Sequence, residues 1–316
     1  MKKLSIAVAA AAALSGWAMS AKAEQFINVL AGGTSGVYYP LAVALSEIYA
    51  ENIPDARPSV QATKASVENL NLLQQGRGEI AFSLGDSVAL AWEGNEEAGF
   101  PQPLDKLRGV AAIYPNYIQV VATASSGVKT LADLAGKGVS VGAPRSGTEL
   151  NARAVFQAAG LTYEDLGKVE YLPFGESVEL MKNRQLDATL QSAGLGVASI
   201  RDLASTNDVT VVAIPPDVVE KIGNPVYVSE IIPAGTYDGQ DEDVPTAAIV
   251  NFLVTHEDVP EEVVYQMTKS MFENLEKMAA AHSAARQISL EKAAQGMPIP
   301  LHPGAERYYR EVGVLN

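Results

Sequence analysis

Small hydroxyl and glycine residues gather in residues 32–36, where the sequence reads Gly-Gly-Thr-Ser-Gly. Glycine lets the chain turn sharply and lets a ligand approach the backbone closely. Thr34 and Ser35 add hydroxyl groups, and Tyr38 and Tyr39 follow with rings that also carry hydroxyls. Such a segment is suited to holding a small anion, such as a carboxylate, through backbone N–H and hydroxyl donors. It lacks the lysine of a phosphate-binding loop and the spacing of a dinucleotide-binding motif.

The flanking residues predict how this segment is held. Residues 26–30 are mostly apolar and predict a buried strand, and apolar residues recur at helical spacing through residues 41–52. Pro40 suits the first turn of that helix, where no backbone N–H is needed. The free N–H groups and the dipole at the start of the helix would then face an anion bound at the turn.

A second segment of the same kind lies further along the chain. Residues 145–149, Arg-Ser-Gly-Thr-Glu, follow a predicted strand at 139–142 and precede a predicted helix at 150–159. If the two segments belong to different lobes, their helix starts can face each other across a cleft. One ligand carboxylate would then be held at one or both ends.

Strands and helices alternate through most of the chain, which predicts the α/β class with doubly wound sheets. Residues 107–114 and 117–124 predict two strands, the second of which could cross between lobes. Residues 247–254 predict the strand that crosses back, and residues 260–281 predict a long amphipathic helix. We therefore expect two doubly wound lobes, joined by a hinge, with a central ligand cleft.

Residues 1–23 predict a cleavable secretory signal peptide. Lys2 and Lys3 precede an apolar run, and Ala21-Lys22-Ala23 supplies a cleavage site of small residues. The apolar run is shorter than the ~20 residues that a membrane-spanning helix needs. Cleavage after Ala23, together with a sequence that contains no cysteine, predicts a periplasmic protein without disulfides.

The composition argues against several function classes. The formal net charge is −14, and −17 without the three lysines of the predicted signal peptide, which argues against nucleic acid or anionic lipid as a partner. His256, His282 and His302 lack metal-ligand spacing, and no Gly-x-Ser-x-Gly motif is present. We therefore expect no catalytic residues, no metal site and no cofactor.

Three stretches, taken in order, resemble the TAXI family, the extracytoplasmic solute receptors of TRAP transporters. They are residues 32–40 (Gly-Gly-Thr-Ser-Gly-Val-Tyr-Tyr-Pro), residues 65–70 (Ala-Ser-Val-Glu-Asn-Leu) and residues 141–149, which end in Ser-Gly-Thr-Glu. The resemblance covers essentially the whole mature chain. It implies a type II periplasmic binding-protein fold that closes on its ligand and delivers it to a permease driven by an ion gradient. Characterised family members bind small carboxylates such as glutamate, glutamine or 2-oxoglutarate.

The resemblance also places ligand contacts residue by residue. One group lies on the opening turn, a second at the next predicted helix start, and a third in the opposite lobe. Further contacts are expected at strand ends that face the cleft. The expected ligand-binding residues are Gly33, Thr34, Ser35, Tyr38, Lys64, Ser66, Val67, Asn69, Asp86, Tyr114, Arg145, Ser146, Gly147, Thr148 and Gln191.

Two basic residues bear on the charge of the ligand. Lys64 stands where smaller residues are common in the family, and Arg145 precedes the Ser-Gly-Thr turn. Either could pair with a second carboxylate, which would favour a dicarboxylate such as glutamate or 2-oxoglutarate. The alternative is that both are solvated surface charges.

The complete prediction is a monomeric periplasmic binding protein. Residues 24–118 and 251–316 would form the first lobe, and residues 119–250 the second. Its partners would be a small carboxylate and the membrane permease subunits of a TRAP transporter. Two alternatives stay open, namely a sensor that reports the ligand to a signalling partner and an exported enzyme on the same scaffold. Uptake lost on deletion would favour transport, and turnover by the purified protein would favour an enzyme.

Overall fold

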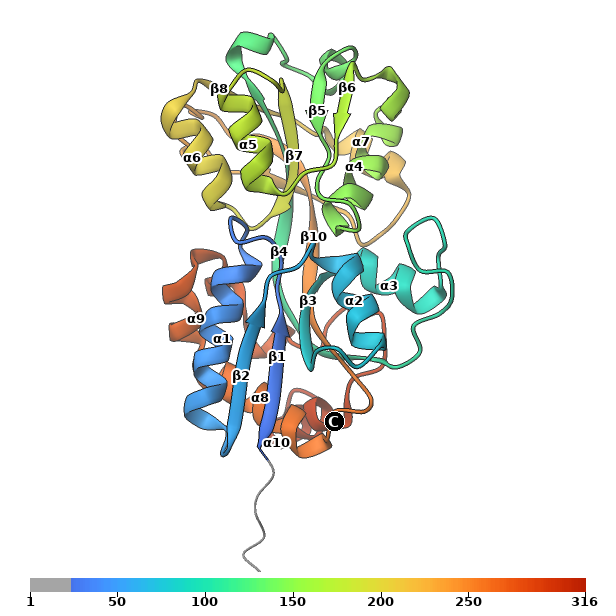
Figure 1. Cartoon of the computed structure of the whole chain (residues 1–316), viewed down its shortest axis with the longest axis vertical. Coiled ribbons are helices and arrows are strands. Elements are labelled where there is room, and N and C mark those ends of the chain that lie inside the picture. The colour runs from blue at the N-terminus through green and yellow to red at the C-terminus, as the bar shows by residue number, and fades with distance from the viewer. Residues whose placement is uncertain (1–23) are drawn as a thin grey trace, which may run out of the picture.

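Two long strands join the two halves of the molecule (Figure 1). The computed structural model describes residues 24–316, so the predicted signal peptide lies outside the described residues. The long strands are β4 (Leu107–Thr123) and β10 (Val244–His256), which pair antiparallel. Every helix in the described part of the chain is too short or too polar to span a lipid bilayer.

The lower half in Figure 1 alternates parallel strands with helices. Its strands are β1 (Gln25–Leu30), β2 (Ala56–Gln61) and β3 (Ile80–Leu84). The helices that follow them are α1 (Tyr38–Asn52), α2 (Ser66–Gln74) and α3 (Gly85–Glu93). Three helices near the C-terminus return to this half: α8 (Glu261–Phe272), α9 (Leu275–Ala281) and α10 (Pro303–Glu311). The apolar face predicted for α1 is buried, including Leu41, Leu45 and Ile48.

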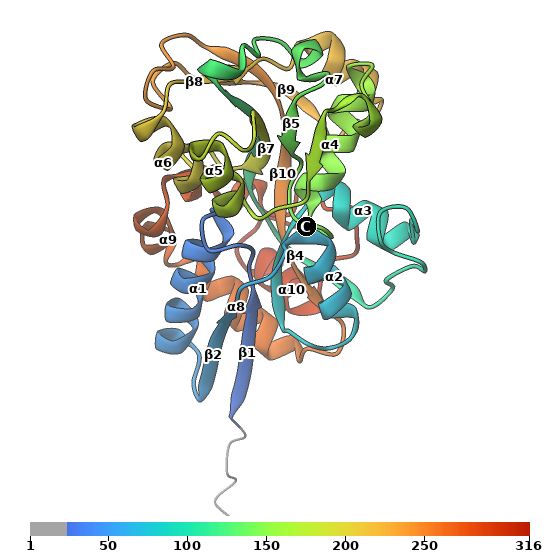
Figure 2. The same cartoon turned by 45° about the horizontal axis from the view of Figure 1, so that its top comes forward.

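The upper half repeats the same alternation. Its strands are β5 (Gly138–Ser140), β6 (Lys168–Glu170), β7 (Ala188–Ala193), β8 (Val209–Val212) and β9 (Val228–Ile232). Its helices are α4 (Gly147–Ala158), α5 (Phe174–Lys182), α6 (Ala198–Thr206) and α7 (Pro216–Ile222). Figures 1 and 2 both show α4 above α2 and α3, and α5 above the start of α1.

One mixed sheet continues through both halves in the order β2-β1-β3-β10-β4-β7-β5-β6, with β8 on β4 and β9 on β10. The parallel pairs are β1–β2 and β1–β3 in the lower half and β5–β6 and β5–β7 in the upper half. Every antiparallel pair involves β4 or β10. The predicted α/β class is therefore confirmed. The predicted lobe boundaries, at 118–119 and 250–251, fall inside these two strands, and we keep that division as a proposal.

The prediction of two strands at 107–114 and 117–124 was wrong, because β4 is one strand of 17 residues. Proline normally interrupts a strand unless it lies at an edge or a bulge. Pro115 pairs with Val250, where the register between β4 and β10 shifts, and this irregularity accommodates it.

The single long helix predicted over 260–281 is two helices, α8 and α9. The break lies at Asn274, whose Nδ2 donates to the carbonyl oxygen of Ser270 over 2.8 Å. Asn274 leaves the helical conformation, with φ −128° and ψ 31°, and serves as the N-cap of α9.

Candidate functional site

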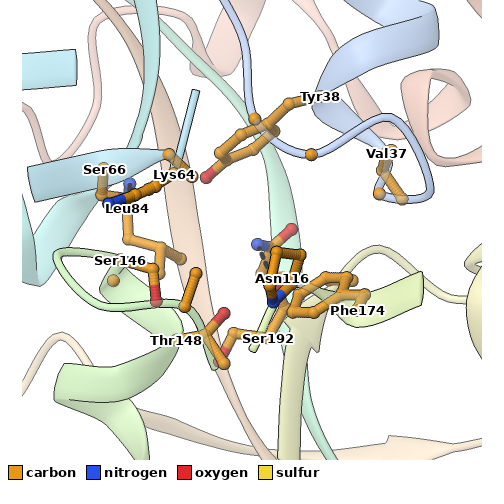
Figure 3. Close-up of a pocket in the computed structure, with 18 of the residues that line it drawn as sticks. Val37, Tyr38, Lys64, Ser66, Leu84, Asn116, Ser146, Thr148, Phe174 and Ser192 are labelled. Atoms are coloured by element: carbon orange, nitrogen blue, oxygen red, sulfur yellow. Dashed lines mark hydrogen bonds between the residues drawn. The ribbon is translucent and has the colours of Figure 1, made fainter. Parts of the chain in front are cut away.

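A cavity of about 100 Å³ lies between the halves. Figure 3 shows Tyr38, Ser66 and Lys64 from the lower half and Ser146 and Thr148 from the upper half around it. The two turn segments found in the sequence therefore share one cavity. Seven expected ligand-binding residues line it: Gly33, Tyr38, Lys64, Ser66, Ser146, Gly147 and Thr148.

Five helices begin at the cavity wall. The N-caps of α1 to α5 all line it, and they are Val37, Ala65, Leu84, Ser146 and Pro173. Only Ser146 of these described N-caps uses its side chain, whose Oγ accepts the N–H of Glu149 over 3.2 Å. First-turn N–H groups and five helix dipoles are thus directed at one small space, which favours negative charge there.

Hydrogen bonds across the central strands fix one wall of the cavity. The Tyr38 hydroxyl donates to Asn251 Oδ1. Asn251 Nδ2 donates to the Tyr114 carbonyl and to Asn116 Oδ1, each over 2.8 Å. Asn116 Nδ2 in turn donates to the Ser192 carbonyl over 2.9 Å. Burial raises the pKa of the Tyr38 hydroxyl, so this group stays protonated and neutral.

Gly147 lets the two halves approach closely at the cavity. A Cβ atom there would lie 2.6 Å from Leu84 Cδ1 and 2.7 Å from Ser66 Oγ, so a larger residue would displace these side chains or move α4 away from the lower half. The neighbouring Thr148 is 5% exposed, and within residues 24–316 its hydroxyl has no hydrogen-bond partner. Thr148 faces the cavity (Figure 3) and is available to a ligand.

The two basic residues singled out in the sequence differ in position. Lys64 is the only charged residue among the described residues that line the cavity, although much of its side chain is exposed. Arg145 is exposed and lies outside the lining. Its carbonyl oxygen accepts the Glu68 N–H over 3.2 Å, which ties the turn before α4 to the first turn of α2.

Asp86 lies next to the cavity and connects the halves. It is 2% exposed in the first turn of α3. Its Oδ2 accepts hydrogen bonds from Asn151 Nδ2 over 2.6 Å and from the Tyr227 hydroxyl over 2.7 Å, both in the upper half. Burial raises the pKa of this carboxyl above its ordinary value, and these bonds act in the opposite direction. Asp86 is outside the cavity lining.

Two of the expected ligand contacts, Val67 and Asn69 on α2, are buried and lie outside the cavity lining. Val67 is buried in the core. Asn69 is fully buried, and its Nδ2 donates to the carbonyls of Ala31 and Phe82 over 2.7 and 2.8 Å. The Asn69 side chain therefore joins α2 to the residue after β1 and to the middle of β3.

The remaining expected contacts lie around the cavity without lining it. Thr34 and Ser35 line a neighbouring groove with Gly175 of α5. Tyr114 and Gln191 are buried, and their Oη and Nε2 atoms have no hydrogen-bond partner within the described residues.

Several lining residues were not expected, including Phe174, Asn116 and Ser192. The sequence contained one signal for Phe174. Pro173 directly precedes it, and proline is common next to the start of a helix. The helix α5 starts directly at Phe174. Asn116 and Ser192 lie on β4 and β7, and strand pairing brings them to the cavity.

A metal site finds no support in the described residues, because no cluster of three His, Cys, Asp or Glu residues within 24–316 could hold an ion. The polar groups that line the cavity are hydroxyls, an amide, backbone groups and one ammonium group, and apolar side chains such as Val37, Leu84 and Phe174 make up much of the rest. This set can bind an anion by hydrogen bonds and by charge.

Comparison with solved structures shows which fold this is. A periplasmic transporter protein has a TM-score of 0.59 at 14% identity, over 93% of this chain and 94% of that chain. PhnD1 from Prochlorococcus marinus, solved with methylphosphonate, has a TM-score of 0.58 at 11% identity, over 93% and 100% of the two chains. The alkanesulfonate-binding protein SsuA from Xanthomonas axonopodis pv. citri, solved with MOPS, has a TM-score of 0.51 at 13% identity, over 85% of each chain. The protein therefore has the periplasmic binding-protein fold.

The sequence itself gives the family. A model of the NMT1-like family matches residues 29–313, which is nearly all of the described chain. On this match, the chain belongs to the NMT1-like family.

Proposed function

We propose that this is a periplasmic solute-binding protein of a transporter, and that the cavity between the halves binds a small carboxylate. One observation carries the proposal, namely that five helices begin at the wall of a single cavity. Helix starts favour anions through free N–H groups and through the dipole. Lys64 adds a positive charge, and the Thr148 hydroxyl adds a donor.

The finer assignment follows the resemblance to the TAXI family. The permease would be a TRAP-type transporter driven by an ion gradient, and the ligand would be glutamate, glutamine or a dicarboxylate like 2-oxoglutarate. Lys64 lines the cavity and would meet a second carboxylate there, whereas Arg145 lies outside the lining. Two proteins of this fold were solved with anions, methylphosphonate and MOPS, which is compatible with anion binding here.

Contacts across the cleft support closure around a ligand. The Glu68 N–H reaches the Arg145 carbonyl, and Asp86 bonds to Asn151 and Tyr227. These bonds join segments of the two halves and would be broken if the halves moved apart about β4 and β10. Hinged closure of this kind is a common way for two-lobed proteins to enclose small ligands.

Binding accounts for the cavity better than catalysis does. The polar groups of the central strands bond to one another, and the Tyr38 hydroxyl is held protonated. The lining offers no carboxylate or imidazole that could serve as a general base within the described residues. A sensor that uses the same closure to signal remains the second candidate.

A thermal-shift screen of amino acids, oxo acids and dicarboxylates on the mature protein tests the proposal. A ligand that binds only the folded state at 100 times its Kd stabilises that state by about 2.7 kcal/mol. We expect at least one small carboxylate to raise the melting temperature and to bind in calorimetry. No response to any carboxylate, or turnover of one of them, would overturn the proposal. Uptake assays with reconstituted permease subunits then separate transport from sensing.

A further inference from the structure

We infer that the ligand is a small carboxylate without an ammonium group, such as a 2-oxo or 2-hydroxy acid, rather than an α-amino acid. This inference rests on the proposed function, because it concerns the same cavity. It narrows the ligand class by asking where the ammonium group of an amino acid could be held.

The cavity wall offers no negative charge to an ammonium group. Lys64 is the only charged residue among the described residues that line it. A charged group that is enclosed without a partner of opposite charge carries a large desolvation penalty. An amino acid bound here would bury its ammonium group among hydroxyls, amides and apolar side chains, with a lysine close by.

Asp86 is the buried acid nearest in the sequence to the lining residue Leu84, and its oxygens are already occupied. Oδ1 accepts the Ser87 N–H over 2.6 Å and the Ser87 hydroxyl over 3.4 Å. Oδ2 accepts the bonds from Asn151 and Tyr227. Four donors match the roughly four acceptor positions of a carboxylate, so no position is left for an ammonium group.

Three glutamates lie within two residues of a lining residue. Glu176 is exposed on the neighbouring groove that Thr34 and Ser35 line, and the other two are engaged by the protein. Glu68 Oε2 accepts the backbone N–H of Lys64 over 2.6 Å. Glu149 Oε1 accepts Arg153 Nε over 2.6 Å and the Tyr163 hydroxyl over 3.1 Å. Neither residue belongs to the cavity lining. Their charges are therefore directed to the protein and not to the ligand.

The helix starts oppose a cation directly. Each of the five helices brings the positive end of its dipole to the cavity wall. The same ends that stabilise a carboxylate destabilise an ammonium group in the same space. The Thr148 hydroxyl and free N–H groups can instead bond to a neutral oxo or hydroxy oxygen next to the carboxylate.

The volume of the cavity limits the size of the ligand. At about 100 Å³, it is well below the roughly 300–1,000 Å³ of sites for drug-sized molecules. An apolar cavity of about 150 Å³ holds benzene. The structure therefore favours a small acid over a drug-sized ligand.

Matched pairs of ligands test this inference on the mature protein. We would measure Kd by calorimetry for pyruvate and lactate against alanine, and for 2-oxoglutarate against glutamate. The amino-free member of each pair should bind at least tenfold more tightly. Equal or tighter binding of the amino acids would overturn the inference and leave the proposed function intact. Failure of every carboxylate to bind would overturn both.

A charge placed in the cavity provides a second test. Thr148→Asp adds a carboxylate in the first turn of α4, where an acidic residue suits the helix dipole. Thr148→Asn serves as the control, because an asparagine side chain has the shape of aspartate without its charge. We expect Thr148→Asp to shift the preference at least tenfold toward amino acids relative to Thr148→Asn. An unchanged preference in folded variants would overturn the inference, because the charge of the wall would then not select the ligand.

Discussion

Asn151 Nδ2 donates a hydrogen bond to Asp86 Oδ2 over 2.6 Å and so joins α4 of the upper half to α3 of the lower half. Tyr227 reaches the same oxygen from the upper half. All three side chains are buried. Separation of the halves would expose these groups to water and break both bonds. We therefore expect Asp86 to stabilise the closed arrangement more than it stabilises either half alone.

Replacing Asp86 by alanine tests this role. The variant leaves the Asn151 amide and the Tyr227 hydroxyl without their acceptor in the closed form, and a buried unsatisfied donor costs about 1–3 kcal/mol. Ligand affinity should fall about tenfold or more, since 1.4 kcal/mol corresponds to about a factor of ten. Calorimetric titration measures the change.

Ser199→Ala is the matched control for that variant. Ser199 Oγ donates to Gln191 Oε1 over 2.6 Å, and both residues belong to the upper half. Loss of this bond should lower the melting temperature while the Kd stays within a few-fold. An equal loss of affinity in both variants would show that Asp86 has no special part in closure.

Asp86 also predicts how stability depends on pH. Burial raises the pKa of Asp86 above its ordinary value of 3.8 in the folded protein, so the folded state binds the proton more tightly than the unfolded state. The resulting stabilisation is fully present below pH 3.8 and is lost as the pH rises through the raised pKa. Asp86→Asn removes the titration. In urea unfolding at a series of pH values, the stability of the wild type relative to this variant should fall with rising pH. Parallel curves would contradict the prediction.

Gly147 predicts a steric effect on closure. In Gly147→Ala, the new methyl group would meet Leu84 and Ser66 at 2.6 and 2.7 Å, so the halves should close less completely. We expect at least a tenfold loss of affinity and a larger radius of gyration in X-ray scattering with ligand present. Gly138→Ala, in β5 of the upper half, is the control, because its new methyl group would lie no closer than 3.4 Å to any neighbour. It should change neither the affinity nor the radius of gyration. Full affinity in Gly147→Ala would show that the halves can close around the ligand despite the added methyl group.

The fold could be predicted largely because local patterns specify its repeated unit. Apolar strands, glycine-rich turns and amphipathic helices follow one another in order, and the units around Gly33 and Gly147 were located from these signals. The continuity of β4 through Pro115 could not be predicted in this way, because it depends on the register shift against β10. The break at Asn274 could not be predicted either, because the apolar pattern continues across it from α8 into α9.

The site could be predicted only in part because sequence does not show which way a side chain faces. Ser146 and Thr148 line the cavity, whereas Asn69 lies outside the lining and bonds to the backbone of Ala31 and Phe82. Asn116 and Ser192 come to the cavity through the pairing of β4 with β7, which is not visible from either segment alone. The convergence of five helix starts is also a property of the assembled sheet.

Lys64 and Arg145 give the last prediction, which concerns a second carboxylate on the ligand. Lys64 lines the cavity, and Arg145 is exposed outside it, although both carry the same charge and lie on the segments that lead into α2 and α4. Lys64→Gln should weaken binding of a dicarboxylate by up to about fivefold, because exposed ion pairs contribute little. It should weaken binding of a monocarboxylate less, and Arg145→Gln should affect neither. Calorimetry with 2-oxoglutarate and pyruvate separates the cases. Equal losses for both acids in Lys64→Gln would mean that the lysine supplies only general positive charge and pairs with no second carboxylate.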